Sequence, residues 1–298
     1  MDDRRSPFKI DGPTSLRFSG GRTSGLMLKR TLEANNAEDL HRWLFISFNN
    51  TGKEEEATLR FVDDCDRHFC KPMGLHVTWL EYRAGPSFAV VDYCSASRDG
   101  EPYRALLEQR IGEGTAGLPN VVNRYCSSEL KTRTTHRYLR SIGWTEWDSF
   151  VGYRADEPRR YMKLRGNPHP EVKAETVSAP LVPAGVAKAD VGTFWRAQPF
   201  DLGLPNVNGV TYHGNCDLCF LKHPTVVRGL VAERPSRAIW WIAQERYAES
   251  MGRRTGARFA DDRESFQAMA AHASEQGDAF GHIDNVAEML PCECGDDA

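Results

Sequence analysis

The sequence predicts an α/β protein with a doubly wound parallel sheet, followed by a helical, loop-rich C-terminal region that carries a cysteine metal site. Short apolar runs alternate with helical stretches in the first half of the chain, which is typical of strand–helix–strand units. Two of these runs end in Gly, Ser or Asn, residues that favour turns after strands. The length of 298 residues is enough for a sizeable core in one or two domains.

The expected elements alternate along the chain. Strands are expected at residues 14–18, 43–48, 76–80 and 149–152, and helices at residues 23–33, 54–69, 127–139, 189–197 and 224–250. Right-handed crossovers between parallel strands would place the loops that follow the strands at one edge of the sheet, where ligands bind. The pattern loosens after residue 166, so a soft boundary there separates an α/β domain (1–166) from a C-terminal region (167–298), unless the two form one integrated domain.

Composition indicates a soluble globular protein, with 40% apolar and 27% charged residues. The first ten residues contain no apolar signal segment, and no stretch is long enough to cross a bilayer, so we expect a cytoplasmic protein without membrane contact. A net charge of −3 argues against a global basic surface for nucleic acid. Residues 124–165, however, contain ten Lys and Arg against five Asp and Glu, which suggests an anionic ligand.

The loop after the first expected strand has the residues needed to hold phosphate groups. It runs Ser19, Gly20, Gly21, Arg22, Thr23 and Ser24, and a helical stretch follows. The glycines allow backbone N–H groups to turn inwards, the helix N-terminus adds unsatisfied N–H groups, and the hydroxyls add donors. The alternative is a tight turn before an ordinary helix, with Thr23 or Ser24 as the N-cap. Neither a Walker motif nor a Gly-x-Gly-x-x-Gly fingerprint occurs in this loop.

Residues 19–24 resemble the PP-loop of the ATP pyrophosphatase superfamily, Ser-Gly-Gly-x-Asp-Ser, with Thr23 in place of Asp. Later blocks resemble the phosphoadenosine phosphosulfate (PAPS) reductase-like family, in the same order: FNNTGKEEEATLRFV, CSSELKTRTTHRYL, VGYRADEPRR, APLVPAGVAKADVGTFW and GNCDLCFLKH. The resemblance implies an adenine nucleotide alpha hydrolase-like fold. It also implies nucleotide contacts at residues 19–24 and at Asn50, Thr51 and Gly52.

The basic blocks supply candidates for neutralising phosphate or sulfate. Arginine suits this role because its planar fork binds two oxygens at once. The resemblance implies that Lys131 and Arg154 are catalytic, and that Arg154, Glu157 and Arg160 contact the nucleotide. Acidic residues beside Arg154 would orient the arginines or hold Mg²⁺ between phosphates. Surface salt bridges on helix faces are the alternative for the basic residues of this segment.

Eight cysteines in a reducing compartment favour metal or redox chemistry over disulfides. Cys216 and Cys219 form a Cys-x-x-Cys, which suits a redox pair, half a zinc site or half an iron–sulfur site. Cys126 is the candidate for a third ligand, and Cys292 or Cys294 for the fourth, with Cys292 assigned to the metal. The resemblance implies a [4Fe-4S] cluster near the nucleotide, with zinc as the alternative. The other cysteines outside this set are expected to be small buried side chains: Cys65, Cys70 and Cys94.

Three functions fit these motifs. The nearly complete Ser-Gly-Gly loop favours an ATP-dependent adenylylating sulfurtransferase, in which ATP activates an acceptor oxygen that sulfur then replaces. The tail Glu293-Cys294-Gly295 is similar to the C-terminus of PAPS reductases and favours a sulfonucleotide (PAPS or APS) reductase in which Cys294 attacks sulfur. The third is a nucleotide-binding module with a structural zinc.

The expected partners follow from these functions. They are an adenine nucleotide (ATP or an adenylyl sulfonucleotide), a sulfur donor or thiol reductant, and a second copy of the chain in a homo-oligomer. The sequence does not specify the acceptor. Nucleic acid is one hypothesis, although no stripe of basic residues interleaved with aromatic residues supports it.

Overall fold

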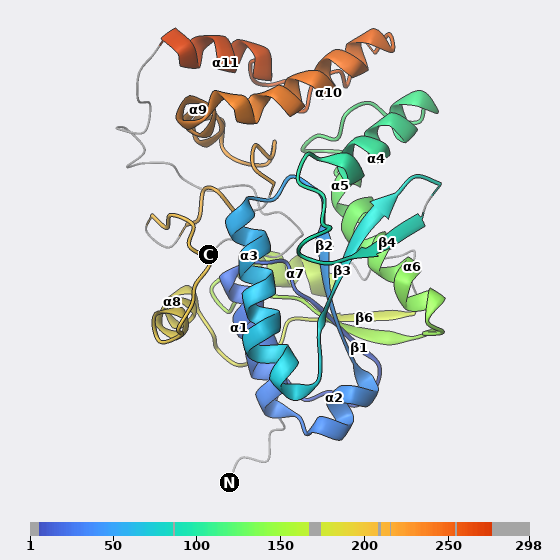
Figure 1. The fold of residues 1–298 in the computed structure, drawn as a ribbon, viewed down its shortest axis with the longest axis vertical. Coiled ribbons are helices and arrows are strands. Elements are labelled where there is room, and N and C mark those ends of the chain that lie inside the picture. The colour runs from blue at the N-terminus through green and yellow to red at the C-terminus, as the bar shows by residue number, and fades with distance from the viewer. Residues whose placement is uncertain are drawn as a thin grey trace.

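A computed structural model describes residues 6–85, 87–166, 174–207, 210–214, 216–253 and 255–275. In these residues six strands form one sheet, in the order β4-β3-β2-β1-β5-β6 (Figure 1). The strands are β1 (Thr14–Arg17), β2 (Leu44–Asn50), β3 (Val77–Arg83), β4 (Ser87–Val91), β5 (Trp147–Phe150) and β6 (Glu175–Ser178). All pairings are parallel except that of β4, which returns antiparallel to β3 at one edge. The α/β prediction is therefore confirmed as a mostly parallel sheet.

Helices connect these strands and cover the sheet. The α-helices of the described residues are α1 (Arg22–Ala34), α2 (Ala37–Trp43), α3 (Glu56–Cys65), α4 (Glu101–Gly112), α5 (Tyr125–Ser127), α6 (Thr134–Ser141), α7 (Pro158–Gly166), α8 (Lys188–Arg196), α9 (Pro224–Glu233), α10 (Ala238–Ser250) and α11 (Phe266–Glu275). A π-helical segment, η3 (Ser128–Arg133), joins α5 to α6. Such segments are rare and are frequent at functional sites, and this one carries Lys131.

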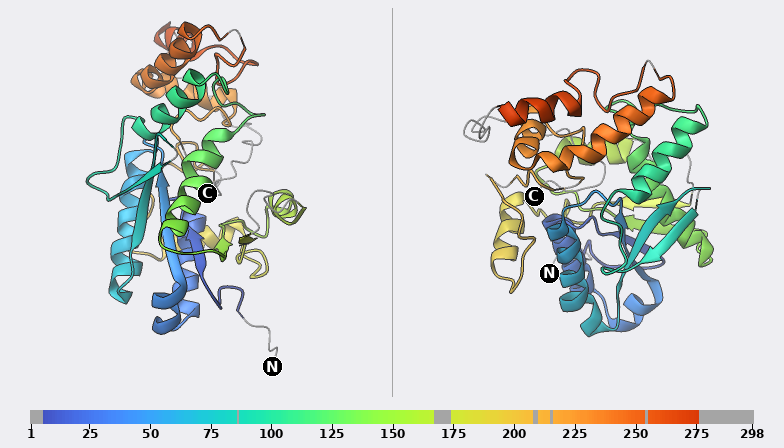
Figure 2. Two further views of the ribbon diagram at one scale, coloured as in Figure 1. Left: turned by 90° about the vertical axis from the view of Figure 1, so that its right-hand side faces the viewer. Right: turned by 45° about the horizontal axis from the view of Figure 1, so that its top comes forward.

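The sheet is packed on both faces because successive strand residues point to opposite sides. On β2, Ile46 belongs to the core that includes residues of α1 and α3, whereas its neighbour Phe45 packs with Leu139 of α6. Figure 2 (left) shows α3 and α6 on opposite sides of the strands. The helices thus cover both faces of the sheet.

The C-terminal part of the chain contributes to the sheet and also forms a second core. Strand β6 lies beyond residue 166 and pairs with β5, and α8 packs against α1. Helices α9, α10 and α11 lie together at one end of the molecule (Figure 1, top), where Trp241, Phe259 and Phe266 pack with Tyr103 of α4. None of the helices in the described residues is long and apolar enough to span a membrane.

The strand order has a switch point at β1. From β1 the chain proceeds through β2 to β3 on one side, and it returns to the other side of β1 as β5. At such a switch point the loops after the two central strands diverge and leave room for a ligand at the carboxyl edge of the sheet. The loop after β1 is residues 18–21, and the loop after β5 begins at Val151.

Candidate functional site

The loop after β1 makes a tight, glycine-dependent turn into α1. Gly20 has a φ of +87°, which L side chains rarely adopt. A Cβ added there would lie 2.7 Å from Cγ2 of Thr58 in α3, closer than real contacts allow. Residues 20–28 are buried, and Ser19 is half-buried. The glycine therefore lets the backbone pass close to α3 before the helix begins.

Helix α1 begins at Arg22 after a residue that has no side chain to cap it. Its N-cap is Gly21, and the first turn contains no acidic residue. The alternative in which Thr23 or Ser24 caps this helix is therefore wrong. The Ser24 hydroxyl instead accepts a hydrogen bond from the Ser19 backbone N–H at 3.2 Å and lies 2.9 Å from Ser19 Oγ. A helix N-terminus without an acidic or capping group is suited to an anion.

The loop after β5 closes over this turn. A Cβ added to Gly152 would lie 3.3 Å from the Ser24 Cα, so the two loops pack backbone against backbone. The buried guanidinium of Arg154 donates from Nη1 to Thr23 Oγ1 at 3.3 Å and from Nε to Asp156 at 2.9 Å. The structure thus brings one predicted phosphate ligand, Arg154, onto the predicted phosphate loop.

Glu157 organises the rest of this loop. Its carboxylate accepts from the Arg154 backbone N–H at 2.9 Å and pairs with Arg160 at 2.5 Å. The Arg160 guanidinium also lies over the Tyr153 ring, 4.5 Å from its centre. Burial raises the pKa of Asp156, but the Arg154 guanidinium outweighs it and holds that pKa below its usual value. The three predicted nucleotide contacts of this block therefore lie together.

Arg22, which was predicted to contact the nucleotide, pairs with residues of the segment that follows α8. Its guanidinium makes a two-point ion pair with Asp201, at 2.7 and 2.6 Å, and donates to Thr211 at 3.2 Å. A cavity of about 820 Å³ lies beside it, lined by α8 together with Asp156, Asp201 and Asn206. This volume is within the range of small-molecule sites. No pattern in the sequence indicated that Arg22 would pair with Asp201, which lies 179 residues later in the chain.

The loop after β2 holds the other predicted nucleotide contacts. The Asn50 side chain donates to Glu81 at 2.6 Å and to the Ser97 carbonyl at 2.8 Å, and it accepts from the Gly52 N–H. Gly52 has a φ of +77° and packs against Gly100. Both residues therefore shape the loop. Thr51 donates to both carboxylate oxygens of Glu54 at 2.9 Å.

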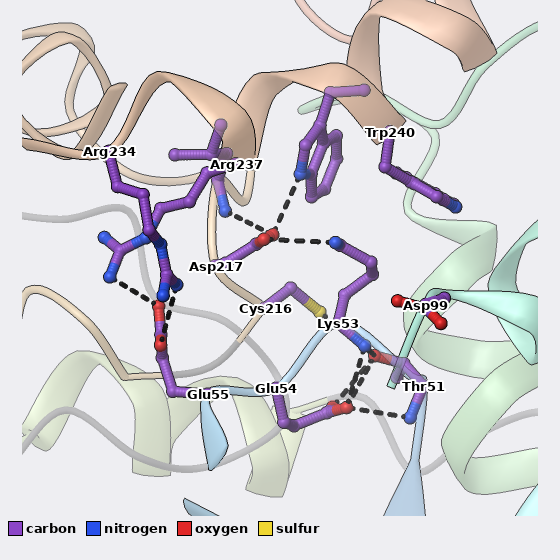
Figure 3. Close-up of polar contacts among 12 residues, drawn as sticks. Thr51, Lys53, Glu54, Glu55, Asp99, Cys216, Asp217, Arg234, Arg237 and Trp240 are labelled. Carbon is purple, nitrogen blue, oxygen red and sulfur yellow. Dashed lines mark hydrogen bonds and ion pairs between the residues drawn. The ribbon is translucent and has the colours of Figure 1, made fainter. Parts of the chain in front are cut away.

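Glu54, Lys131 and Cys216 meet at this loop (Figure 3 shows Glu54 and Cys216). Burial raises the pKa of Glu54, and the Lys131 ammonium acts in the opposite direction. Burial also raises the pKa of the Cys216 thiol, Glu54 raises it further, and Lys131 opposes both. The sequence indicated Lys131 as a catalytic cation, but it contained no signal for Glu54 as its neighbour.

Three of the four predicted metal ligands face one tyrosine. Burial raises the pKa of Tyr103 well above its usual value, and the thiols of Cys126, Cys216 and Cys219 add to this effect. All three cysteines pack against the same apolar core. Within the described ranges, however, no group of three His, Cys, Asp or Glu side chains is close enough together to hold a metal ion. Cys292 and Cys294 lie outside the described residues.

The Cys-x-x-Cys turn is fixed by Asp217, which sequence reasoning did not single out. Its carboxylate pairs with Lys53 Nζ at 3.1 Å and accepts from Trp241 Nε1 at 2.8 Å, and its backbone carbonyl accepts from Lys222 Nζ at 2.8 Å (Figure 3). Its backbone N–H donates to the Lys53 carbonyl at 2.8 Å. Asp217 and Lys222 lie within the cysteine block, but their charges alone did not reveal these roles.

These residues fit a thiolate-ligated centre in donor type. Thiolates suit zinc and iron–sulfur clusters, and the buried lysine beside the turn suits a centre of negative charge. A fourth ligand would have to come from Cys292 or Cys294. Of the remaining cysteines, Cys65 and Cys70 are buried as expected.

The expectation for Cys94 is wrong, because its side chain is exposed. It lies in a turn three residues after the end of β4, at the edge of the sheet rather than in the core. An apolar or mixed neighbourhood in sequence did not distinguish this edge turn from a buried strand.

Comparisons with known proteins add one distant similarity. No protein-family model matches the chain. Over 210 residues it is 29% identical to an uncharacterized nin region protein, ORF290, of Escherichia phage lambda. The match covers 69% of this chain, and the chain spans 64% of the length of that phage protein. The name of this relative states no activity.

Proposed function

We propose that the protein is a PP-loop enzyme of the PAPS reductase-like type that uses ATP to adenylylate an acceptor for sulfur transfer. The observation that carries this proposal is the N-terminus of α1 at the β1–β5 switch point. Its N-cap is a glycine, its first turn contains no acidic residue, and Arg154 approaches it through Thr23. Together these features supply backbone donors and one buried cation for the phosphates of ATP.

The proposed reaction balances without an oxidant or reductant. An acceptor oxygen attacks the α-phosphorus of ATP, the bond from that phosphorus to the bridging oxygen breaks, and pyrophosphate leaves. Hydrosulfide then attacks the activated carbon, a C–S bond forms, the C–O bond breaks, and AMP leaves with the oxygen. The acceptor is thereby thiolated, and nucleic acid remains one candidate for it.

Residues of this chain have distinct tasks in the proposal. The amides at residues 20–24 and Arg154 hold the phosphates that become pyrophosphate, and Mg²⁺ would neutralise further charge. Lys131, beside Glu54, would offset negative charge near the thiols. A [4Fe-4S] cluster on Cys126, Cys216, Cys219 and Cys292, or zinc in its place, would supply a site that retains sulfide close to the nucleotide.

The reaction can be tested by following the α-phosphate of labelled ATP. Anaerobically purified protein would be incubated with ATP, Mg²⁺ and sodium sulfide, with total tRNA in one series and duplex DNA in another. We expect acceptor-dependent AMP and pyrophosphate, reduced in Ser24→Ala and unchanged in Ser141→Ala, which removes an exposed hydroxyl at the end of α6. Absence of AMP together with absence of ATP binding would overturn the proposal.

The same protein preparation discriminates the two other functions. Thiol-dependent release of sulfite from PAPS or APS, without ATP cleavage, would favour the sulfonucleotide reductase indicated by the Glu293-Cys294-Gly295 tail. Nucleotide binding and bound zinc without either reaction would favour the binding module. Iron, zinc and sulfide analysis of the same sample identifies the metal.

A further inference from the structure

Three arginines from three different elements converge on one buried carboxylate. The side chain of Glu129 is 5% exposed. Its carboxylate pairs with Arg110 of α4 at 2.5 Å, Arg133 of η3 at 2.6 Å and Arg137 of α6 at 2.8 Å. Burial raises the pKa of Glu129, but the hydrogen bonds from Arg137 and Arg133 outweigh it and hold that pKa below its usual value. The carboxylate is therefore ionised and carries one negative charge.

This single charge is shared among more than one guanidinium. Arg110 and Arg137 share it even when Arg133 is left out of the count. A second acid, Glu113 at the end of α4, also acts on this part of the molecule, but it is exposed, so water screens its charge. The group is therefore locally positive, although the chain as a whole has a net charge of −3.

Aromatic rings pack against these guanidiniums. Arg137 lies 5.9 Å from the centre of the Tyr82 ring, and Arg110 lies 5.9 Å from that of Tyr125. Burial raises the pKa of Tyr125, whereas Arg110 and Arg253, which follows α10, act in the opposite direction. The fold thus gathers arginines and tyrosines that are far apart in the sequence, on a side of the molecule where α4, α5 and α6 follow one another (Figure 1).

The guanidiniums keep donors that their ion pairs do not use. The side chains of Arg110 and Arg137 are 31% and 24% exposed, and each contacts Glu129 through Nη2. Among the described residues, Nη1 of Arg137 is buried without a hydrogen-bond partner. A guanidinium has five N–H donors, and two of them fit the oxygens of one phosphate group. The buried carboxylate therefore orients the arginines from below and leaves N–H groups for an anion.

The same group borders the nucleotide edge of the sheet. Tyr82 lies near the carboxyl end of β3, which is parallel to β2 and therefore ends at the same edge as the loop after β2. The segment η3 packs against β2, β3 and α4, and it also carries Lys131, whose ammonium acts on Glu54 in that loop. A polymer bound by the arginines would consequently pass beside the loop after β2.

We propose that Arg110, Arg137 and Arg253 bind the phosphodiester backbone of a single strand of nucleic acid, and that this strand is the acceptor of the proposed reaction. Arginine suits this contact because its planar fork matches phosphate oxygens. A single strand is required, because a base that is stacked and paired in a duplex cannot reach a catalytic loop. The inference deepens the proposed function by naming its substrate class; it rests on that function for the reaction, but not for binding.

The test measures the fluorescence anisotropy of a labelled single-stranded DNA of about 20 nucleotides, longer than most single-strand binding sites. RNA of the same sequence and the corresponding DNA duplex form the other arms, and each is titrated with the full chain at several salt concentrations. We expect a single strand to bind more tightly than the duplex, with an affinity that decreases as salt increases. The DNA and RNA arms identify which strand is preferred. Tighter binding of the duplex, or no binding of any probe, would overturn the inference.

Charge-neutral variants locate the binding surface. The double variant Arg110→Gln, Arg137→Gln should bind the single strand more than about tenfold more weakly, since it loses two charge-assisted contacts. Its slope of log affinity against log salt should also decrease by about 1.4, because each phosphate contact on a single strand contributes about 0.7. The control is Arg67→Gln, which removes an exposed arginine directly after α3, and it should bind like wild type. A loss of the same size in Arg67→Gln would overturn the inference.

Thermal unfolding checks that the variants are folded. The double variant leaves the buried Glu129 with fewer counter-charges, so it should also be less stable than wild type. Arg253→Gln is the second variant, because Arg253 makes no ion pair with Glu129. It should unfold like wild type and reduce the salt slope by about 0.7. If the double variant does not fold, an unchanged affinity and slope in Arg253→Gln would overturn the inference.

Failure of the inference and failure of the proposed function are distinguishable, because strand binding is measured without ATP. Absence of strand binding in a protein that binds ATP rejects the nucleic-acid surface and leaves adenylylation of another acceptor standing. Strand binding that depends on these arginines, in a protein that does not bind ATP, rejects the proposed function and leaves the surface standing.

Discussion

The hydroxyl oxygen of Thr51 lies 3.5 Å from the sulfur of Cys216, which joins the loop after β2 to the Cys-x-x-Cys turn. The backbone continues this junction, since Glu54 and Cys216 form an isolated antiparallel bridge. One strand-end loop therefore borders both the predicted nucleotide edge of the sheet and the thiols. A ligand at either place is expected to order the same short segment.

The turn at Gly20 should tolerate no side chain. Gly20→Ala imposes an unfavourable positive φ and a contact of 2.7 Å with Thr58, so we expect it to lower the free energy of unfolding strongly. The backbone term is about 1–2 kcal/mol, and forcing extra atoms into a packed site adds about 1–3 kcal/mol. Urea unfolding of the purified variant measures the sum.

Two glycines provide controls for this prediction. Gly143 has a φ of +91° with open space around its Cβ position, so Gly143→Ala should show the backbone term alone. Gly12→Ala, without positive φ or close neighbours, should be nearly neutral. If Gly20→Ala were no more destabilising than Gly143→Ala, the close packing of the loop against α3 would be in error.

Arg154 should contribute more to nucleotide affinity than Arg159, which lies in the same basic block. Arg154→Met removes a buried cation beside Thr23, and hydrogen bonds to charged groups contribute about 1.5–3 kcal/mol. We therefore expect ATP binding, measured by calorimetry, to weaken by more than about tenfold. The exposed Arg159 is the matched control, and Arg159→Met should bind ATP like wild type. Equal losses in the two variants would indicate general charge attraction instead of a specific site.

Stability should decrease as the pH falls, because of a buried network around Glu175. Burial lowers the pKa of His136, although Glu175 opposes this effect. Burial raises the pKa of Glu175, but His136, Arg17 and Ser149 outweigh it and hold that pKa far below 4.5. Both groups accept a proton more readily in the unfolded chain, so acid favours unfolding. The free energy of unfolding should begin to decrease below pH 6.5, the ordinary pKa of histidine. It should decrease more steeply around pH 4.5, the ordinary pKa of glutamate.

Glu175→Gln separates the carboxylate part of this effect. At pH 7 it should destabilise the protein by about 3–5 kcal/mol, because it leaves buried basic partners without their counter-charge. Between pH 5 and pH 4, however, its unfolding free energy should depend less on pH than that of wild type. Urea unfolding across this range measures both quantities. An unchanged slope would remove Glu175 from the account of acid stability.

The three candidate ligand thiols should differ from the exposed thiol of Cys94 in their effect on metal content. Cys126→Ser, Cys216→Ser and Cys219→Ser each remove a candidate ligand, and we expect each variant to lose most of its bound metal after anaerobic purification. The exposed Cys94 is the control, and Cys94→Ser should retain metal at the wild-type level. Metal analysis with protein quantitation measures this. Equal metal content in all four variants would exclude the three thiols as ligands.

Much of the fold could be predicted where strands were short and apolar. The segments expected at 14–18 and 76–80 correspond to β1 and β3, and the expected helix at 23–33 corresponds to α1. β4 and β6 were missed, because β4 is half-exposed at the sheet edge and β6 is a polar four-residue strand. The partner of β6, strand β5, lies more than 20 residues earlier in the chain, whereas β4 pairs with β3 directly before it.

Helix boundaries failed where an apolar pattern continued past a local break. The helix expected at 224–250 is divided into α9 and α10, because Pro235 lacks an N–H and starts a separate short turn. Similarly, Trp43 was expected to begin β2 but ends α2. Apolar residues on both sides of each junction hid the break.

The candidate site was predictable in its motifs and less so in its charges. Cys126 was expected to lie beside Cys216 and Cys219; all three act on Tyr103, but among the described residues they form no group that could hold a metal ion. The pairing of Arg22 with Asp201 was not predictable, because it depends on how the segment after α8 returns to α1. Spacing specifies local geometry, whereas the partner of a charge is set by the tertiary fold.

The most direct test of the central claim is to record the backbone amide resonances of residues 19–24 while ATP and Mg²⁺ are added. We expect the amides of Gly20, Gly21 and the first turn of α1 to show the largest shifts, pyrophosphate to reproduce these shifts, and Arg154→Met to reduce them. Shifts confined to other parts of the chain, with these amides unmoved at saturating ATP, would contradict it.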